Sequence, residues 1–210
     1  MLQAKNIEFH YNSDLKFQIP EINLKSGEQL LIIGKSGSGK TTILNILGGL
    51  LKPLSGEVII DETSVYSLTG GKLDKFRGKN IGIIFQKPHI LAALNVEENL
   101  KLANFFAGEK SDLIQPLLKE LGIYEKRKAN VNTLSEGEAQ RVSIARALVN
   151  NPKVILADEP TASLDDENAS IVVKLLKQQA EKYNAALIIV THDQRVKDLI
   201  FNQITIGGES

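Results

Sequence analysis

Short runs of apolar residues alternate with polar turns along this chain, and the spacing inside each run separates strands from helices. In the first third the runs are short and bounded by Asn, Ser, Asp and Gly, which is typical of strands. The strands predicted there cover residues 2–11, 17–24, 29–33 and 57–60, and another short apolar strand is predicted over 81–85.

The middle of the chain, roughly residues 87–150, has mostly helical spacing. One helical stripe is formed by Leu113, Ile114, Leu117, Leu118 and Leu121. Gly122 follows it directly and predicts the end of that helix. Beyond residue 150, strands over 154–157 and 187–190 flank a helix from about 166 to 183. Alternation of this kind predicts an α/β fold with a mainly parallel sheet covered by helices.

Composition narrows the possible functions. A chain of 210 residues can bury one sizeable core, so we expect a single domain with a subdomain. The 25 acidic and 25 basic residues cancel, which argues against nucleic acid as a partner. There is no cysteine for a disulfide or a thiolate metal site. No apolar stretch reaches the ~18–20 residues that span a bilayer, so we expect any membrane role to need a separate subunit.

The most informative segment reads Gly-Lys-Ser-Gly-Ser-Gly-Lys-Thr and follows the apolar run 29–33. Its glycines permit backbone conformations in which successive N–H groups face one phosphate, and the helix that follows adds its positive end. Lys40 can reach the β- and γ-phosphates of a nucleoside triphosphate, and the Thr41 hydroxyl can hold Mg²⁺. The residues predicted to bind ATP in this loop are Gly34, Lys35, Ser36, Gly37, Ser38, Gly39, Lys40, Thr41 and Thr42. The alternative is a surface turn rich in Gly and Ser.

A second chemical signal is the apolar strand 154–157, which runs into Asp158 and Glu159. An aspartate that ends a buried strand beside a phosphate loop is placed to hold Mg²⁺. Glu159 can then orient or activate the water that attacks the γ-phosphate. Without the phosphate loop, the same residues would be read as an acidic turn.

Residues 134–141 read Leu-Ser-Glu-Gly-Glu-Ala-Gln-Arg and precede a helical apolar pattern. Ser135 and Glu138 satisfy the capping-box spacing S-x-x-E, so the segment predicts a well-capped helix start. The N-terminus of a capped helix is itself a site for anions, so a role in phosphate binding is compatible with the capping role.

Six motifs, taken in their order along the chain, resemble the ATP-binding cassette (ABC) family over nearly the whole chain. They are the phosphate loop, Phe85-Gln86, residues 134–138, 155–160 and 162–165, and Thr191-His192-Asp193. The resemblance implies a P-loop NTPase core with an N-terminal antiparallel β subdomain and an inserted α-helical subdomain. Residues 1–86 and 151–210 would form the nucleotide-binding core, and residues 87–150 the helical subdomain within one domain, 1–210.

The resemblance also implies roles for single residues. Tyr11 matches the aromatic residue that stacks on adenine, and Gln86 matches the glutamine that contacts Mg²⁺ and the attacking water. Asp165 matches the loop that links the two nucleotide sites of a dimer. His192 matches the histidine that contacts the γ-phosphate. The implied catalytic residues are Glu159, Gln86, His192 and Lys40, and the implied Mg²⁺ ligands are Thr41, Gln86 and Asp158.

Ser135, Gly137 and Glu138 match the signature that closes on the γ-phosphate bound by a second copy. The commonest family form is Leu-Ser-Gly-Gly-Gln, whereas this chain has Glu136 in place of Gly and Glu138 in place of Gln. This departure concerns the strength of the contact across the dimer.

Residues 45–53 and 94–99 are similar to the group that contains macrolide exporters, lipoprotein-release ATPases and the cell-division cassette. That similarity implies a cytoplasmic ATPase that dimerises head to tail around two Mg-ATP and sits on the inner face of the membrane through an integral permease subunit. The alternative within the group is a mechanical or regulatory ATPase without a transported substrate. A cassette of DNA repair or translation is a third possibility, against which stands the lack of a coiled-coil insertion and of a second cassette.

Overall fold

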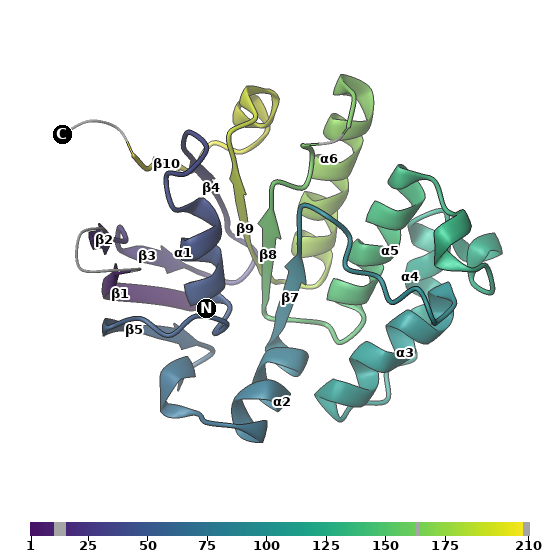
Figure 1. The fold of residues 1–210 in the computed structure, drawn as a ribbon, viewed down its shortest axis with the longest axis horizontal. Helices are drawn as coiled ribbons and strands as arrows, with labels where there is room; N and C mark the ends of the chain where they lie inside the picture. Colours follow the sequence, from purple (N-terminus) through teal and green to yellow (C-terminus); the bar gives the residue numbers. More distant parts are fainter. Residues whose placement is uncertain (11–15, 163, 208–210) are drawn as a thin grey trace.

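The computed structural model describes residues 1–10, 16–162 and 164–207, and within them the chain forms two sheets (Figure 1). The first sheet is antiparallel, with the order β2-β1-β5-β6, and β3 pairs with the first residues of β1. Its strands are β1 (Leu2–His10), β2 (Lys16–Gln18), β3 (Ile22–Leu24), β5 (Ser55–Ile60) and β6 (Thr63–Ser64). The single strand predicted over 17–24 is therefore wrong. Pro20 lies in the break and has no N–H to donate to a ladder.

The second sheet is parallel throughout, with the order β10-β4-β9-β8-β7. Its strands are β4 (Gln29–Ile33), β7 (Ile81–Ile84), β8 (Val154–Asp158), β9 (Ala186–Thr191) and β10 (Gln203–Thr205). Side chains of the inner strands pack alternately on the two faces: Leu31 and Ile33 lie in one core, and Leu30 and Ile32 in the other. Both faces are buried, which explains why these strands are continuous apolar runs.

The helices lie on both faces of the parallel sheet. They are α1 (Lys40–Leu47), α2 (Gly71–Asn80), α3 (Val96–Ala107), α4 (Ile114–Glu120), α5 (Glu136–Leu148) and α6 (Asp166–Lys182). The short 3₁₀ helices are η1 (Val65–Ser67), η2 (Tyr124–Lys126), η3 (Val131–Thr133) and η4 (Gln194–Leu199). Helix α1 packs between the two sheets, while α3 to α6 lie on the other side of the parallel sheet (Figure 1). No helix of the described residues is long and apolar enough to cross a membrane.

The sequence prediction missed α2 and β10. Helix α2 has no fully buried residue, and only Leu73 and Phe76 pack partly against the core. It therefore lacks the apolar stripe from which a helix is recognised. Strand β10 is three residues long and mostly exposed, and it is held by its pairing with β4.

The register of the parallel sheet determines what meets at its carboxyl edge. Ile33 of β4 pairs with Thr191 of β9, and Asp158 of β8 pairs with Val190 of β9. The residues that follow these three strands therefore emerge side by side, at the edge where open parallel sheets bind ligands.

Candidate functional site

The loop between β4 and α1 has a backbone that requires glycine. Gly37 and Gly39 have φ angles of 80° and 93°, in the left-handed region that side chains disfavour. At Gly34, an added Cβ would lie 2.3 Å from the Ser38 hydroxyl oxygen and 2.8 Å from the backbone oxygen of Ile206. Gly39 caps α1, so the first free N–H groups of that helix point into the loop. The loop thus has the form of an anion cradle.

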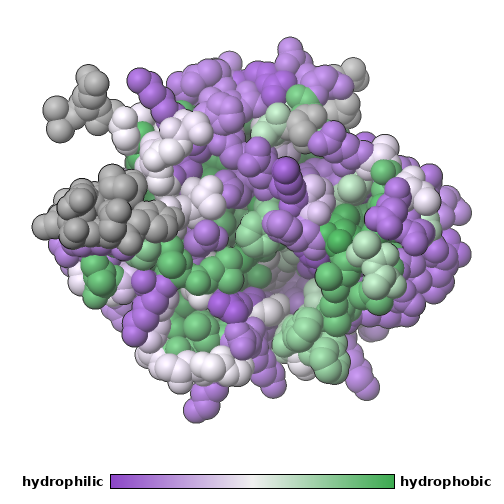
Figure 2. Space-filling model, in the orientation of Figure 1, coloured by the Kyte–Doolittle hydropathy of each residue, from purple (hydrophilic) through white to green (hydrophobic). Residues whose placement is uncertain are grey.

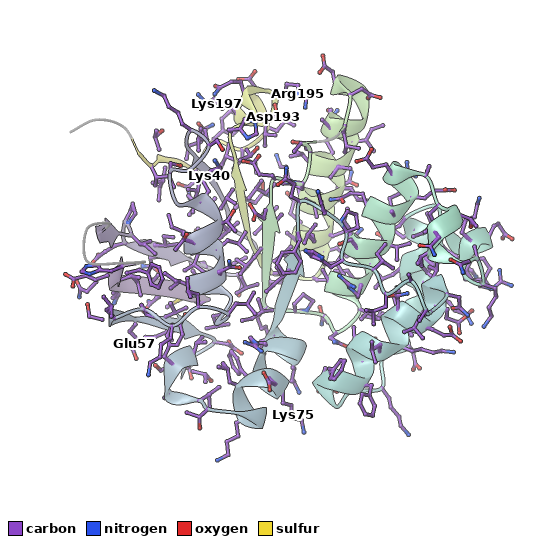
Figure 3. The ribbon with its side chains drawn as sticks, in the orientation of Figure 1. Lys40, Glu57, Lys75, Asp193, Arg195 and Lys197 are labelled. Atoms are coloured by element: carbon purple, nitrogen blue, oxygen red, sulfur yellow. The ribbon has the colours of Figure 1, made fainter. Side chains whose placement is uncertain are left out.

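Lys40 is the first residue of α1, and its side chain turns back into the loop (Figure 3). The ammonium group donates to the carbonyl oxygens of Gly34 at 2.9 Å and of Lys35 at 3.1 Å. It also lies 3.4 Å from a carboxylate oxygen of Glu159, and both side chains are more than 90% buried. A buried cation therefore stands within the cradle and beside a buried anion.

Glu159 follows β8 directly, and its φ of 46° is unusual for a residue with a side chain. Its carboxylate accepts hydrogen bonds from the Thr191 hydroxyl at 2.7 Å and from the backbone N–H of His192 at 3.2 Å. The His192 Nδ1 lies 2.8 Å from Glu159 Oε1, and since an ionised carboxylate only accepts, Nδ1 carries the proton. Burial opposes ionisation of Glu159, but the bonds from His192 and Thr191 outweigh it and hold the pKa of this carboxyl below its ordinary value.

The pKa of Asp158, the last residue of β8, is shifted in the opposite direction to that of Glu159. Burial raises the pKa of its carboxyl, against the opposing effect of a hydrogen bond with the Thr41 side chain. The other carboxylate oxygen, Oδ1, is buried and has no hydrogen-bond partner among the described residues. A buried carboxylate oxygen without a partner, next to a threonine hydroxyl, matches the oxygen ligands that Mg²⁺ prefers, so the residues fit this ion.

The phosphate loop borders a cavity of about 370 Å³ together with Gln86, Glu159 and His192, whereas Asp158 does not line it. Its lining residues are Ser36, Gly37, Gly39, Lys40, Thr41, Thr42, Gln86, Glu159 and His192. The structure thus brings together the phosphate loop, Gln86, Glu159 and His192 from four separate parts of the chain. A cavity with a buried ammonium, a ring nitrogen and two carboxylates nearby can bind a polyphosphate and activate a water molecule beside it.

Other predicted site residues lie elsewhere. Tyr11 is outside the described residues. Ser135, Gly137 and Glu138, at the start of α5, do not line this cavity, and neither does the exposed Asp165. Their predicted roles concern a second copy of the chain, so their distance from this cavity does not test them.

The predicted capping box at the start of α5 is confirmed. The Ser135 hydroxyl accepts from the Glu138 N–H, and the Glu138 carboxylate accepts from the Ser135 N–H at 2.8 Å. Lys126 adds an ammonium 3.3 Å from the second carboxylate oxygen of Glu138. The bond from the Ser135 N–H, and then those from the Ser135 hydroxyl and Lys126, lower the pKa of Glu138. Glu138 is therefore ionised but already engaged by its own helix and by η2.

The sequence prediction also missed Thr191, whose hydroxyl lies against Glu159. In the sequence, Thr191 stands out only as the residue before His192. Its position offered a signal, because the last residue of a parallel strand faces the same edge as the carboxylates that end the next strand.

Comparisons with known proteins identify the family and the fold. A family model described as ABC transporter matches residues 17–162. The lipoprotein-releasing system ATP-binding protein LolD of Shewanella frigidimarina is 35% identical to this chain over 98% of this chain and 90% of its own length. The macrolide export ATP-binding/permease protein MacB of Campylobacter jejuni is 38% identical over 93% of this chain, which corresponds to 31% of MacB.

A solved structure, the dimeric post-hydrolysis state of the ATP-binding cassette MJ0796 bound to ADP and Pi, has the same fold. The TM-score is 0.86 and the identity 35%, over 98% of this chain and 94% of that one. The predicted fold class is thereby confirmed.

The capping box makes a prediction about stability. Changing Glu138 to Ala removes one half of the box and the contact with Lys126, and we expect the melting temperature to fall by roughly 2–4 °C. Glu138→Gln, the matched control, can still accept from the Ser135 N–H and should melt within about 1 °C of the unchanged protein. Thermal unfolding followed by circular dichroism measures both. Equal melting temperatures for all three proteins would mean that this box does not hold the helix start.

Proposed function

This chain belongs to the ABC transporter family, and we propose that it is the ATPase subunit that binds two Mg-ATP between two copies of itself and drives a separate membrane subunit. ATP binding and ATPase activity follow from the family and from the likeness to the cassette that holds ADP and Pi. The single observation that carries the proposal is the buried pair of Lys40, within the phosphate cradle, and Glu159 beside it, 3.4 Å apart.

We infer that the γ-phosphate takes the place of Glu159 as the counterion of Lys40. The ammonium would keep its position in the loop and exchange a carboxylate oxygen for phosphate oxygens. Glu159 would then be free to accept a proton from water. In the reaction, the water oxygen bonds to the γ-phosphorus, the bond from phosphorus to the ADP oxygen breaks, and the proton passes to Glu159.

The remaining residues of the cavity support this step. His192 bonds to Glu159 through Nδ1 and through its backbone N–H, so it would hold the carboxylate in a fixed orientation. Thr41, Asp158 and Gln86 would hold Mg²⁺, which, when bound, offsets the negative charge that develops on the phosphates.

The second copy would complete each site. We propose that Ser135, Gly137 and Glu138 of one copy approach the γ-phosphate held by the other, and that Asp165 lies between the two sites. The dimeric state of the MJ0796 cassette supports this arrangement. The capping box and Lys126 turn the Glu138 charge toward its own chain, which reduces its repulsion of the phosphate. Tyr11 would stack on adenine.

We further propose that the membrane subunit docks in a groove of about 580 Å³ between α2, α3 and α5. Leu91 and Phe106 line this groove, and their side chains are 48% and 63% exposed. Figure 2 shows hydrophobic side chains gathered on this face of the molecule. The name of MacB, an ATP-binding/permease protein, supports a permease as the occupant. Residues 87–150 would then form the helical subdomain that transmits the motion.

The groove also contains a cation without a matching anion. The Arg146 guanidinium donates to the carbonyl of His89, and burial lowers its pKa. It has no carboxylate partner within the described part of the chain. A half-buried charge without a carboxylate partner in the described residues is unfavourable, so we expect the docking segment of the membrane subunit to be apolar with one carboxylate near Arg146.

The proposed role of Glu159 is tested by Glu159→Gln. This variant keeps the cradle but loses the proton acceptor, so we expect ATP hydrolysis to slow by about 10²- to 10⁴-fold while ATP binding persists. The unreacted protein should then accumulate as an ATP-bound dimer in gel filtration. Glu57→Gln, on the exposed face of the antiparallel sheet (Figure 3), is the control and should behave as the unchanged protein. Normal turnover by Glu159→Gln would remove this residue from the mechanism.

The docking groove is tested by Leu91→Glu and Phe106→Glu. Each places a charge in the apolar groove, so recovery of the permease with the tagged protein from detergent-solubilised membranes should fall about tenfold, with ATPase activity retained. The control is Phe201→Glu, because Phe201 is 92% exposed and does not line the groove. If both groove variants instead lose activity and melt earlier, Leu91 and Phe106 belong to the core of the helical region and the groove is not the docking site.

A further inference from the structure

Arg195, in η4, bonds to two segments that leave the catalytic edge of the sheet (Figure 3). Its Nε donates to both carboxylate oxygens of Asp193, at 2.9 Å and 3.1 Å, and its Nη2 donates to Asp193 at 2.8 Å. Its Nη1 donates to the Leu164 carbonyl at 3.2 Å and to Asp166 at 2.6 Å. Its Nη2 also reaches the Thr161 carbonyl at 3.4 Å. One side chain thus joins the loop after β9 to the turn between β8 and α6.

The loop after β9 leads directly to Glu159. The backbone N–H of Asp193 donates to the Thr191 hydroxyl oxygen at 3.0 Å, and that hydroxyl donates to Glu159 at 2.7 Å. A hydroxyl group has one proton, so an N–H donor on one side of its oxygen directs the proton to the other side. The position of Asp193 therefore decides whether the Thr191 hydroxyl keeps donating its hydrogen bond to the Glu159 carboxylate.

Asp193 itself is held from two directions. Its carboxylate accepts from Arg195 and from the Thr161 hydroxyl at 2.8 Å, and its side chain is only 9% exposed. The bonds from Arg195, and then the bond from Thr161, lower the pKa of Asp193 to about 2 despite the opposing effect of burial. The bonds from Arg195 are charge-assisted and have the planar fork geometry that only a guanidinium provides.

We propose that Arg195 is a positioning residue for ATP hydrolysis, whose fork holds the turn after Glu159 and the loop after β9 as one unit. Arg195 does not line the nucleotide cavity, so it acts through Asp193 and Thr191 on the orientation of Glu159. The inference rests on the proposed role of Glu159 as the proton acceptor. The same turn carries Asp165. A contact of Asp165 with a second copy of the chain would therefore change, through Arg195, the orientation of the Glu159 carboxylate.

Two substitutions separate this role from a structural ion pair. Arg195→Gln removes the charge and the fork. Arg195→Lys keeps a charge that can pair with Asp193, but a single ammonium cannot at once reach the carbonyls of Thr161 and Leu164. Lys197→Gln is the matched control, because it removes one positive charge from the same 3₁₀ helix and no ion pair of Lys197 is found among the described residues.

The measurements are kcat and KM for Mg-ATP, the affinity for a fluorescent ATP analogue, and the melting temperature of the full chain. We expect both Arg195 variants to lower kcat by roughly ten- to a hundredfold, because the carboxylate loses its orientation, while KM and analogue affinity change by less than about twofold. Arg195→Lys should restore the melting temperature toward that of the unchanged protein without restoring kcat. The control should match the unchanged protein in every readout.

The route through Thr191 is tested by a double-mutant cycle. If Arg195 acts by way of the Thr191 hydroxyl, the single variant Thr191→Val lowers kcat. The double variant with Arg195→Lys then has a kcat only a little lower than that of Thr191→Val. The inference is overturned if Arg195→Lys restores kcat together with the melting temperature, if Arg195→Gln leaves kcat unchanged, or if the two losses multiply. Glu159→Gln is assayed in parallel: normal turnover in that variant contradicts the proposed function itself, whatever the Arg195 variants do.

Discussion

The whole arrangement depends on the parallel register of three buried strands. Because β4, β9 and β8 run in the same direction, with Ile33 paired to Thr191 and Asp158 paired to Val190, their carboxyl ends open at one edge of the sheet. The phosphate loop, the pair Asp158 and Glu159, and His192 all follow at that edge. Apolar cores cover both faces of these strands and fix the register, so packing far from the cavity sets distances within it. A shift of one residue in β8 would turn its side chains to the opposite faces.

The charges at this edge are arranged for a ligand that carries both signs. Taking an ion out of water costs several kcal/mol, and the protein offsets this cost by pairing Lys40 with Glu159 and with two loop carbonyls. Asp158 keeps a buried oxygen that has no hydrogen-bond partner in the described residues, and burial raises the pKa of the Asp158 carboxyl. On the proposed function, a polyphosphate would supply anionic oxygens for Lys40, and its metal ion would supply a cation for Asp158. A nucleotide with its magnesium ion would therefore complete the site more fully than either component alone.

Much of the fold and of the candidate site could be predicted from the sequence, because the strongest sequence patterns are local. The phosphate loop is a contiguous motif, and the apolar runs of β4, β8 and β9 are long enough to be recognised as buried strands. Helix α2 was missed because its residues pack only partly against the core, and the break at Pro20 was missed because the flanking apolar residues continue the strand pattern. The link from Arg195 to Leu164 could not be predicted, since an arginine in a polar segment gives no sign of which distant carbonyl it will meet.

The central claim is that the carboxyl edge of the parallel sheet binds ATP and its magnesium ion together, with Asp158 holding the metal. The most direct test is calorimetric titration of ATP with and without Mg²⁺, for the unchanged protein and for Asp158→Asn. The account predicts that Mg²⁺ strengthens ATP binding by about tenfold or more in the unchanged protein. In the absence of Mg²⁺, Asp158→Asn should bind ATP with the same affinity as the unchanged protein. Adding Mg²⁺ should not increase the ATP affinity of this variant. An equal gain in both proteins would contradict the account.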